Sequence, residues 1–129
     1  MKNFKKHITI CSLALAFILM SSFKTQDADA IIGTWKEQGG TKTIQIYKVD
    51  EFYFGKLTEN LSTDENKIKP GTIIMKNFVY ENGVWEGTIE IPNRDMSLKG
   101  KIVLENENQM KAIATVIFVG KSKVWDRVK

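Results

Sequence analysis

The chain has 129 residues, of which 43% are hydrophobic, 26% charged and 10% aromatic, with a formal net charge of +4. This composition is typical of one globular domain and excludes disordered and fibrous proteins. The only histidine, His7, and the only cysteine, Cys11, both lie close to the N-terminus. If that segment is removed, a Ser-His-Asp site, a Cys-His site and a histidine-based zinc site are all excluded.

The first 30 residues contain the three parts of a secretory signal peptide. Lysines come first, an apolar stretch follows at residues 8–20, and Ala28-Asp29-Ala30 ends the segment. We predict a signal peptide over residues 1–30, cleavage after Ala30, and an exported domain over residues 31–129 that is periplasmic or secreted. A retained membrane anchor is the alternative, but a membrane-crossing helix needs roughly 20 apolar residues.

Cys11 raises the further alternative of a lipid-anchored protein. A lipidated cysteine follows the apolar centre of a leader, whereas Cys11 lies inside that centre, so we interpret it as part of the leader. Removing residues 1–30 takes away four lysines and two aspartates and leaves a formal net charge of +2. A nearly neutral domain lacks the basic surface that nucleic acids require, so we expect no nucleic-acid partner. We also expect no membrane span once the leader is gone.

Residues after Ile31 alternate between apolar and polar side chains, which is typical of strands with one buried face. We predict eight strands, at residues 33–38, 42–48, 52–58, 73–80, 84–91, 97–104, 109–118 and 122–128. Their connections are mostly short, so neighbouring strands should be antiparallel. Closure of the sheet would remove its exposed edges. The expected fold is an all-β, eight-stranded antiparallel up-and-down barrel.

The longest expected connection is residues 59–72, with the sequence ENLSTDENKIKPGT. Loops of this length are uncommon and often serve as lids or binding loops, although a solvated connection without function is the favoured alternative. Within it, Asp64-Glu65-Asn66 offers oxygen atoms to calcium but lacks the spacing of a full calcium loop.

The Asn82-Gly83 pair is typical of a type I′ hairpin turn and fixes which side chains face inward. This turn places Tyr80 opposite Trp85 and Phe78 opposite Gly87, where the aromatic ring fills the volume missing at glycine. The same register puts Lys76 opposite an inward isoleucine, Ile89. Either a β-bulge intervenes there or the register is shifted by one residue.

Small residues occupy inward positions on three consecutive strands: Gly87, Gly100, Ala112 and Ala114. An eight-stranded barrel is wide enough to hold one small ligand or to be filled by its own side chains. We predict an apolar pocket lined by Phe78, Trp85, Gly87, Gly100, Ala112 and Ala114. The alternative is that Phe78, Trp85 or another aromatic ring fills this space.

The carboxylate pairs of the domain do not indicate catalysis. Asp50 and Glu51 lie in a turn and Asp64 and Glu65 in the long loop, without the apolar surroundings that acid–base catalysis by a carboxylic acid needs. We therefore expect a non-enzymatic protein without catalytic residues, metal site or cofactor.

Two terminal motifs, Gly33-Thr34-Trp35 and Trp125-Asp126-Arg127-Val128, resemble the arrangement of the lipocalins. In that family the tryptophan of the first strand lies across one end of the barrel, and an arginine of the last strand packs over it. The resemblance implies a lipocalin- or calycin-like barrel closed by Trp35 and Arg127. A guanidinium over an indole ring contributes about 0.5–2 kcal/mol.

A longer ordered set of motifs resembles a family of small exported bacterial proteins, domain-of-unknown-function family twenty-one forty-seven (DUF2147). These motifs are Gly33-Thr34-Trp35, Ile44-Gln45-Ile46-Tyr47, Phe54-Gly55-Lys56-Leu57, Trp85-Glu86-Gly87-Thr88-Ile89 and Trp125-Asp126-Arg127-Val128. The chain departs from the family pattern at Pro92-Asn93-Arg94-Asp95 and at Gly120-Lys121-Ser122. The resemblance implies export and a lipocalin-like barrel, and it carries no established activity.

Two hypotheses of function follow. In the first, an exported barrel binds a small apolar or amphipathic ligand, as the small inward residues and the long loop indicate. In the second, a solid barrel serves as a non-enzymatic envelope interaction or structural protein through the outward apolar residues Val79, Val103, Ile113 and Ile117. A hollow interior would favour the first hypothesis, and an interior filled by aromatic rings would favour the second.

Overall fold

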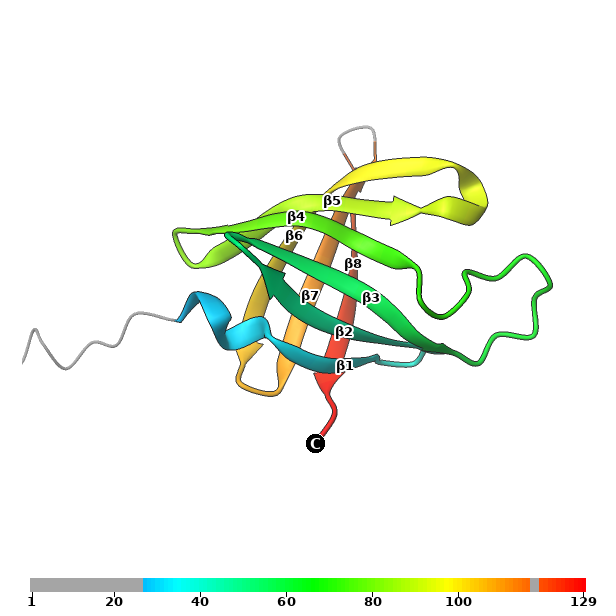
Figure 1. The fold of residues 1–129 in the computed structure, drawn as a ribbon, viewed down its shortest axis with the longest axis horizontal. Coiled ribbons are helices and arrows are strands. Elements are labelled where there is room, and N and C mark those ends of the chain that lie inside the picture. Colours follow the sequence, from blue (N-terminus) through cyan, green and yellow to red (C-terminus); the bar gives the residue numbers. More distant parts are fainter. Residues whose placement is uncertain (1–26, 117–118) are drawn as a thin grey trace, which may run out of the picture.

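The computed structural model describes residues 27–116 and 119–129, most of which are in β-strands (Figure 1). The strands are β1 (Gly33–Glu37), β2 (Lys42–Val49), β3 (Phe52–Asn60), β4 (Ile73–Glu81), β5 (Val84–Ile91), β6 (Met96–Asn106), β7 (Gln109–Val116) and β8 (Val119–Arg127). Two short 3-10 helices are added, η1 (Ala28–Ile31) and η2 (Pro92–Arg94). Within the described residues, no helix has the length and apolar character to cross a membrane. His7, Cys11 and most of the expected signal peptide lie outside them, as do Ile117 and Phe118.

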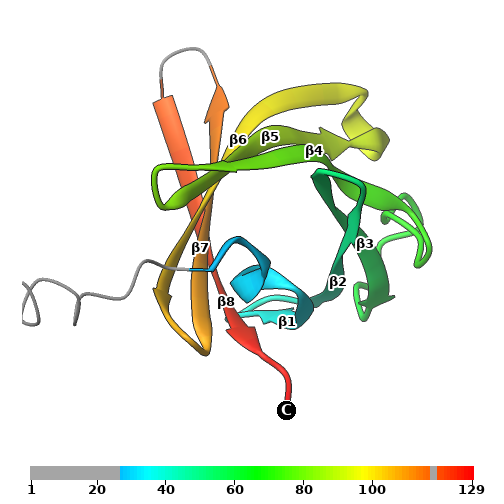
Figure 2. The same ribbon diagram turned by 60° about the vertical axis from the view of Figure 1, so that its left-hand side comes forward.

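Every strand pairs antiparallel with the next in sequence, and β1 pairs with β8 to close the barrel (Figure 2). The predicted eight-stranded up-and-down barrel is thereby confirmed. Several strands extend beyond their predicted ends; β3 continues to Asn60, which pairs with Lys42, and β8 begins at Val119. The polar ends of these strands carry little hydrophobic alternation, so the sequence pattern underestimates their length.

A β-bulge at Asn77 resolves the register of β4 against β5. Tyr80 pairs with Trp85 as predicted, but the register shifts between Lys76 and Val79. Asn77 has a φ of 55°, a left-handed conformation that asparagine tolerates better than most residues. The extra residue places Lys76 opposite Thr88 instead of Ile89, so the lysine is exposed. Of the two predicted explanations, the bulge is the correct one.

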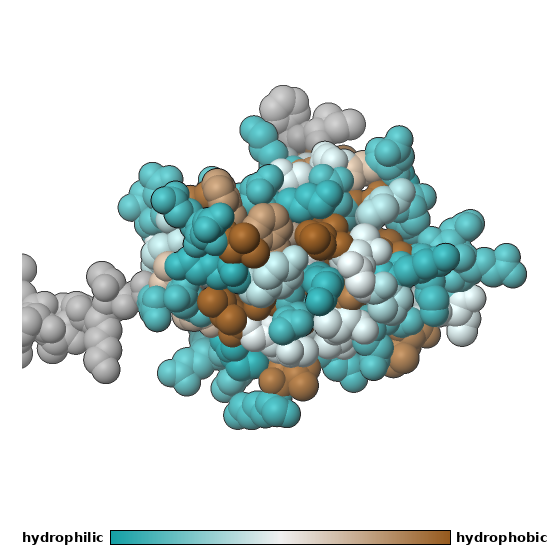
Figure 3. Space-filling view, in the orientation of Figure 1, coloured by the Kyte–Doolittle hydropathy of each residue, from teal (hydrophilic) through white to brown (hydrophobic). Residues whose placement is uncertain are grey.

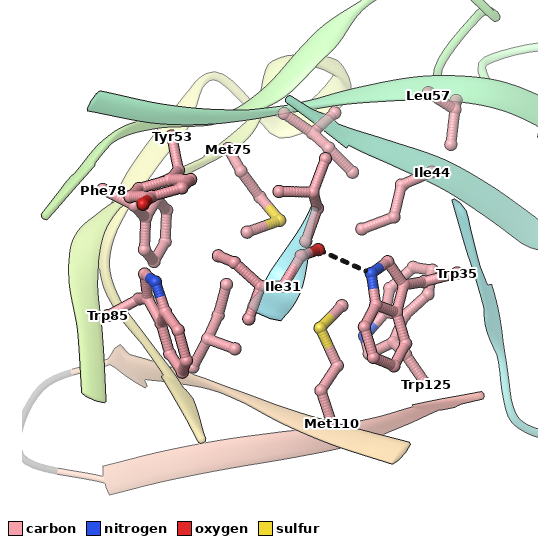
Figure 4. Packing of buried hydrophobic residues seen from close by; sticks show 13 residues of the cluster. Ile31, Trp35, Ile44, Tyr53, Leu57, Met75, Phe78, Trp85, Met110 and Trp125 are labelled. Atoms are coloured by element: carbon pink, nitrogen blue, oxygen red, sulfur yellow. Dashed lines mark hydrogen bonds between the residues drawn. The ribbon is translucent and has the colours of Figure 1, made fainter. Parts of the chain in front are cut away.

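The hydrophobic core is centred on Ile31, at the end of η1 (Figure 4). This side chain is fully buried and lies among Trp35, Met75, Trp85 and Met110, which come from four different strands. Large apolar side chains therefore fill the barrel interior on the side of η1, at the close packing that is typical of protein interiors.

The barrel has two different ends. One, the closed end, carries η1 and the β2–β3, β4–β5 and β6–β7 turns; η1 lies within the ring of strands in Figure 2. The other, the open end, carries the β1–β2 turn, the loop at residues 61–72, and η2. In Figure 1 the closed end is on the left and the long loop on the right. The boundary expected after Ala30 falls inside η1, which is packed into the barrel.

Candidate ligand-binding site

Two buried tryptophans hold η1 in the closed end. The indole Nε1 of Trp35 donates to the carbonyl oxygen of Ile31 at 3.0 Å, and the indole Nε1 of Trp85 donates to that of Ala28 at 2.9 Å. Both side chains are fully buried. A buried indole N–H without a partner is costly, so these two carbonyls satisfy donors that water cannot reach.

Arg127 adds a second set of contacts to the same segment. Its Nη2 donates to the carbonyl of Ala30 at 2.6 Å and its Nη1 to that of Ile32 at 3.0 Å. The guanidinium carbon lies 4.3 Å from the centre of the Trp35 ring, the arrangement that the lipocalin resemblance implies. A side chain at Gly33 would meet Nη1 of Arg127 at 2.6 Å, so the glycine of the G-x-W motif makes room for the arginine.

Asp29 fixes the outer side of η1. Its carboxylate accepts a hydrogen bond of 2.5 Å from the hydroxyl of Tyr53 and one of 3.2 Å from Lys48. The tyrosine hydrogen bond, followed by that of the lysine, lowers the pKa of Asp29. Burial, followed by the hydrogen bond to Asp29, raises the pKa of Tyr53, so the hydroxyl remains a donor at neutral pH. Side chains from several strands therefore hold η1 in the closed end through hydrogen bonds.

The open end contains a cavity of about 660 Å³. Apolar side chains from five strands form its wall, among them Met75, Ile89, Leu98, Ala112 and Ala114. The volume lies within the range of roughly 300–1,000 Å³ that small-molecule sites occupy. The barrel interior is thus filled by core side chains at the closed end and hollow at the open end. A second, shallower hollow of about 630 Å³ at the closed end is bordered by Ala30, Arg127 and the β6–β7 turn.

The six residues predicted to line a pocket are divided between these two regions. Ala112 and Ala114 line the cavity, whereas Phe78 and Trp85 are fully buried in the core. Side chains fill the space beside the two glycines. A Cβ at Gly87 would lie 2.6 Å from the ring of Phe78, and one at Gly100 would lie 2.6 Å from Ile89. At the two glycines, Phe78 and Ile89 fill the interior, as the alternative of a filled barrel predicted for Phe78. Of the six predicted residues, Ala112 and Ala114 are the ones that line the cavity.

Two lysines that the sequence analysis did not assign to the site lie beside these alanines. Ala112 pairs with Lys123 and Ala114 with Lys121 across the β7–β8 ladder, and both lysines line the cavity. Alternation from the buried Trp125 places positions 123 and 121 on the inner face. The predicted strand started at residue 122, so Lys121 lay outside it.

A buried carboxylate lies next to the cavity. The side chain of Glu37 is only 8% exposed, and its Oε2 accepts from the Nζ of Lys123 at 2.9 Å. A Cβ at Gly40 would collide with this carboxylate, so the absence of a side chain there lets Glu37 fold against the β1–β2 turn. Glu37 is inward on the strand that also carries Trp35, a position that alternation could have revealed.

The long loop forms part of the cavity mouth through Ser62, Asp64, Lys67 and Ile68. It is tied to β3, because Asn60 donates from Nδ2 to the carbonyl of Ile68 at 2.9 Å. Lys67 donates to the carbonyls of Asn60 and Ser62 at 3.2 and 3.1 Å. Asp64 accepts from the backbone N–H of Asn66, and no group of three potential metal ligands occurs among the residues that the structure describes. The loop thus borders the cavity.

The outward apolar residues named for the second hypothesis differ in their exposure. Val79 is 43% exposed, Val103 and Ile113 are half-buried, and Ile117 lies outside the described residues. On the face shown in Figure 3, hydrophobic surface appears as separate patches among hydrophilic side chains. Scattered apolar residues of this kind are normal on protein surfaces.

A comparison with protein families finds one matching family model, described as "Uncharacterized protein conserved in bacteria (DUF2147)", over residues 33–127. This range extends from the glycine of the first motif to the arginine of the last. A comparison with curated proteins finds no match.

Solved structures support the fold. One similar chain is the Helicobacter pylori protein HP1028, described as belonging to the lipocalin family, with a TM-score of 0.64 and 8% identity. The match covers 77% of this chain and 83% of HP1028. Another is a redesigned β-barrel, b11L5F_LGL, with a TM-score of 0.53 and 16% identity, which covers 84% of this chain and 100% of the design. At these identities the likeness concerns the fold alone.

Proposed function

The chain belongs to the DUF2147 family, and from the geometry of its barrel we propose that it binds a small apolar or amphipathic molecule in the cavity at the open end. The observation that carries this proposal is a hollow of about 660 Å³ with apolar walls in a barrel whose other half is solid. Close packing is the rule in small domains, and an unfilled apolar cavity forfeits dispersion contacts unless a ligand supplies them.

The proposal is of a binding protein and not an enzyme. The charged groups that line the cavity include a carboxylate already paired with a lysine, Glu37 with Lys123. A lysine that is more than half exposed and neutralised in this way is a poor nucleophile or base, because such roles need a desolvated amine. Binding needs only the apolar wall and a few polar groups at the mouth.

The experiment is a titration of the protein with the neutral apolar dye N-phenylnaphthylamine, whose fluorescence rises in apolar surroundings. We expect saturable binding of one dye per chain. The variant Ala114→Phe places a phenyl ring in the cavity at the alanine wall of β7 and should weaken binding about tenfold, since the ring blocks contact between the dye and that wall. The matched control Thr115→Phe places the same ring on the exposed outer face of β7 and should bind like the unchanged protein.

Two results would contradict the proposal. One is a linear, non-saturating fluorescence signal from the unchanged protein. The other is equal dye affinity in Ala114→Phe and Thr115→Phe, which would mean that the dye binds outside the barrel. Circular dichroism of each variant checks that the strands are intact.

We further propose that the protein works outside the cytoplasm, in the periplasm or after secretion. Support comes from the N-terminal lysines and the apolar stretch at residues 8–20, which precede the barrel. Fractionation of cells that express the full chain, followed by mass determination of the product, tests this proposal. A product of full-length mass in the cytoplasmic fraction would contradict it.

A further inference from the structure

We propose that the cavity selects amphiphiles whose polar head is an acid, such as a carboxylate or a phosphate monoester, with the head beside Lys42 and Lys121. This inference deepens the proposed function and depends on it. The apolar part of the ligand would lie against the alanine wall of β7, and the head would face the mouth of the barrel.

The charges that line the cavity favour an anion. Five cationic side chains face three carboxylates there, so the net charge of the lining is positive. Two of the cations are already engaged: Lys123 with Glu37 at 2.9 Å, and Lys67 with two loop carbonyls. The other three, Lys42, Arg94 and Lys121, make no ion pair or hydrogen bond with any other side chain among the described residues. Arg94 belongs to η2, whereas Lys42 and Lys121 lie on the barrel strands β2 and β8. Unpaired cations at the mouth of an apolar hollow can bind an acidic head with little competition.

The inner face of β7 and β8 separates the apolar and charged parts of the site. Ala114 lies opposite Lys121 and Ala112 opposite Lys123. Each lysine side chain therefore has a small residue as its cross-strand neighbour. The methylene groups of a lysine can cover apolar wall while its ammonium group stays in water. A ligand with one apolar and one acidic end matches this arrangement, whereas a cationic head would be repelled.

Glu37 reduces the number of cations that are free to bind an acidic head. Removing its charge should therefore raise the affinity for acids, whereas removing a lysine should lower it. Its carboxylate forms an ion pair with Lys123. The Lys123 side chain is 60% exposed, so water can solvate its ammonium group when the ion pair is broken. Replacing Glu37 with glutamine removes one negative charge from the cavity and frees Lys123 for the ligand. The affinity for acids should therefore rise.

The experiment measures displacement of the neutral dye by four ligands with the same twelve-carbon chain: dodecanoate, dodecyl phosphate, dodecanol and dodecyltrimethylammonium. All are used below the concentration at which they aggregate. We expect the two acids to bind about five- to tenfold more tightly than the alcohol and the cation to bind most weakly, since exposed charge pairs contribute modestly. The ratio of carboxylate to phosphate affinity distinguishes a fatty-acid source from a phospholipid source.

Three variants test which residues produce the preference for acidic heads. The double variant Lys42→Gln/Lys121→Gln should lose most of the preference for acids and keep its affinity for dodecanol. Glu37→Gln should bind the acids two- to fourfold more tightly, as is expected for one additional exposed cation. The matched control Lys99→Gln/Lys101→Gln changes net charge equally on the exposed outer face of β6, and it should behave like the unchanged protein.

The outcomes separate this inference from the proposed function. If the acids, the alcohol and the cation compete equally, the cavity binds apolar molecules without head selection, and the inference is wrong while the proposed function stands. The inference is also wrong if the outer-face control loses acid preference as strongly as Lys42→Gln/Lys121→Gln. If the dye itself does not bind saturably, the proposed function fails, and the inference that depends on it fails with it.

Discussion

The two ends of this barrel are made from the same strands, but they use side chains of different size and charge. Along the inner face of β7, the buried Met110 at the closed end gives way to Ala112 and Ala114 at the open end. Along β8, Arg127 and Trp125 give way to Lys123 and Lys121. From the closed end to the open end, the side chains of β7 and β8 therefore fill less of the barrel interior, although the pairing between the two strands continues without interruption.

The difference shows how one barrel can be both stable and hollow. At the closed end, Trp35, Trp85 and Arg127 all donate hydrogen bonds to backbone carbonyls of residues 28–32. These bonds satisfy polar groups that packing has removed from water, and each satisfied group avoids a desolvation cost of about 1–3 kcal/mol. We expect the open end to contribute less to stability, because the cavity there leaves its lining side chains with fewer packing partners.

The largest effect is expected from removing part of η1. A chain that begins at Ile31 lacks the carboxylate of Asp29 and the carbonyls of Ala28 and Ala30, so the donors of Tyr53, Trp85 and Arg127 lose their partners. We expect its free energy of unfolding to be lower by about 3–6 kcal/mol than that of a chain beginning at Asp27. Urea denaturation of both chains measures the difference.

Equal denaturation midpoints for these two chains would show that η1 contributes nothing to stability. The result also bears on processing. A product cleaved after Ala30 would lack the same contacts, and N-terminal sequencing of the protein purified from cells that express the full chain shows which residues it retains.

The next largest effect concerns Arg127. Replacement by methionine keeps much of its volume but removes its hydrogen bonds to the carbonyls of Ala30, Ile32 and Glu107 and its contact with the Trp35 ring. We expect a loss of about 2–3 kcal/mol. The matched variant Arg127→Lys keeps the charge over the indole and should lose less. Thermal denaturation measures both, and equal stability of all three proteins would contradict this account of the closed end.

A smaller effect concerns acid. Because hydrogen bonds from Tyr53 and Lys48 lower the pKa of Asp29 below the usual 3.8 of an aspartate, the native state favours the charged carboxylate. This contribution is complete above that value and is lost as the pH falls through the lower folded-state pKa. The melting temperature of the unchanged protein should therefore fall more steeply between about pH 5 and pH 2 than that of Asp29→Asn. Parallel melting curves for the two proteins over this range would contradict the prediction.

The smallest effect on stability is expected at the open end. Lys42→Gln and Lys121→Gln break no ion pair or side-chain hydrogen bond among the described residues, so each should change the free energy of unfolding by less than about 0.5 kcal/mol. Chemical denaturation measures this, with Lys99→Gln as the control on the outer face. A loss comparable to that of Arg127→Met would mean that the open end is as tightly packed as the closed end.

Local pattern was sufficient to predict the fold. Alternation gave the strands, and the Asn82-Gly83 turn gave the pairing of Tyr80 with Trp85, because both depend on residues close in sequence. The terminal motifs indicated where Trp35 and Arg127 meet, and the ordered set of motifs indicated the family.

The site could be predicted only in part. Ala112 and Ala114 line the cavity as expected, but Gly87 and Gly100 do not, because the ring of Phe78 and the side chain of Ile89 occupy the space beside them. Which small residue borders free volume depends on how large side chains from other strands cross the interior, and no single strand pattern contains that information.

The sequence by itself determined the all-β class, the strand order and the contact between the first and last strands, because hydrophobic alternation and turn chemistry act over a few residues. Only the tertiary structure decided that η1 fills one end, that Lys121 and Lys123 line the other, and that Glu37 neutralises one of them. These features join residues up to 97 positions apart, as in the hydrogen bond from Arg127 to Ala30, and they are fixed by the packing of the closed barrel.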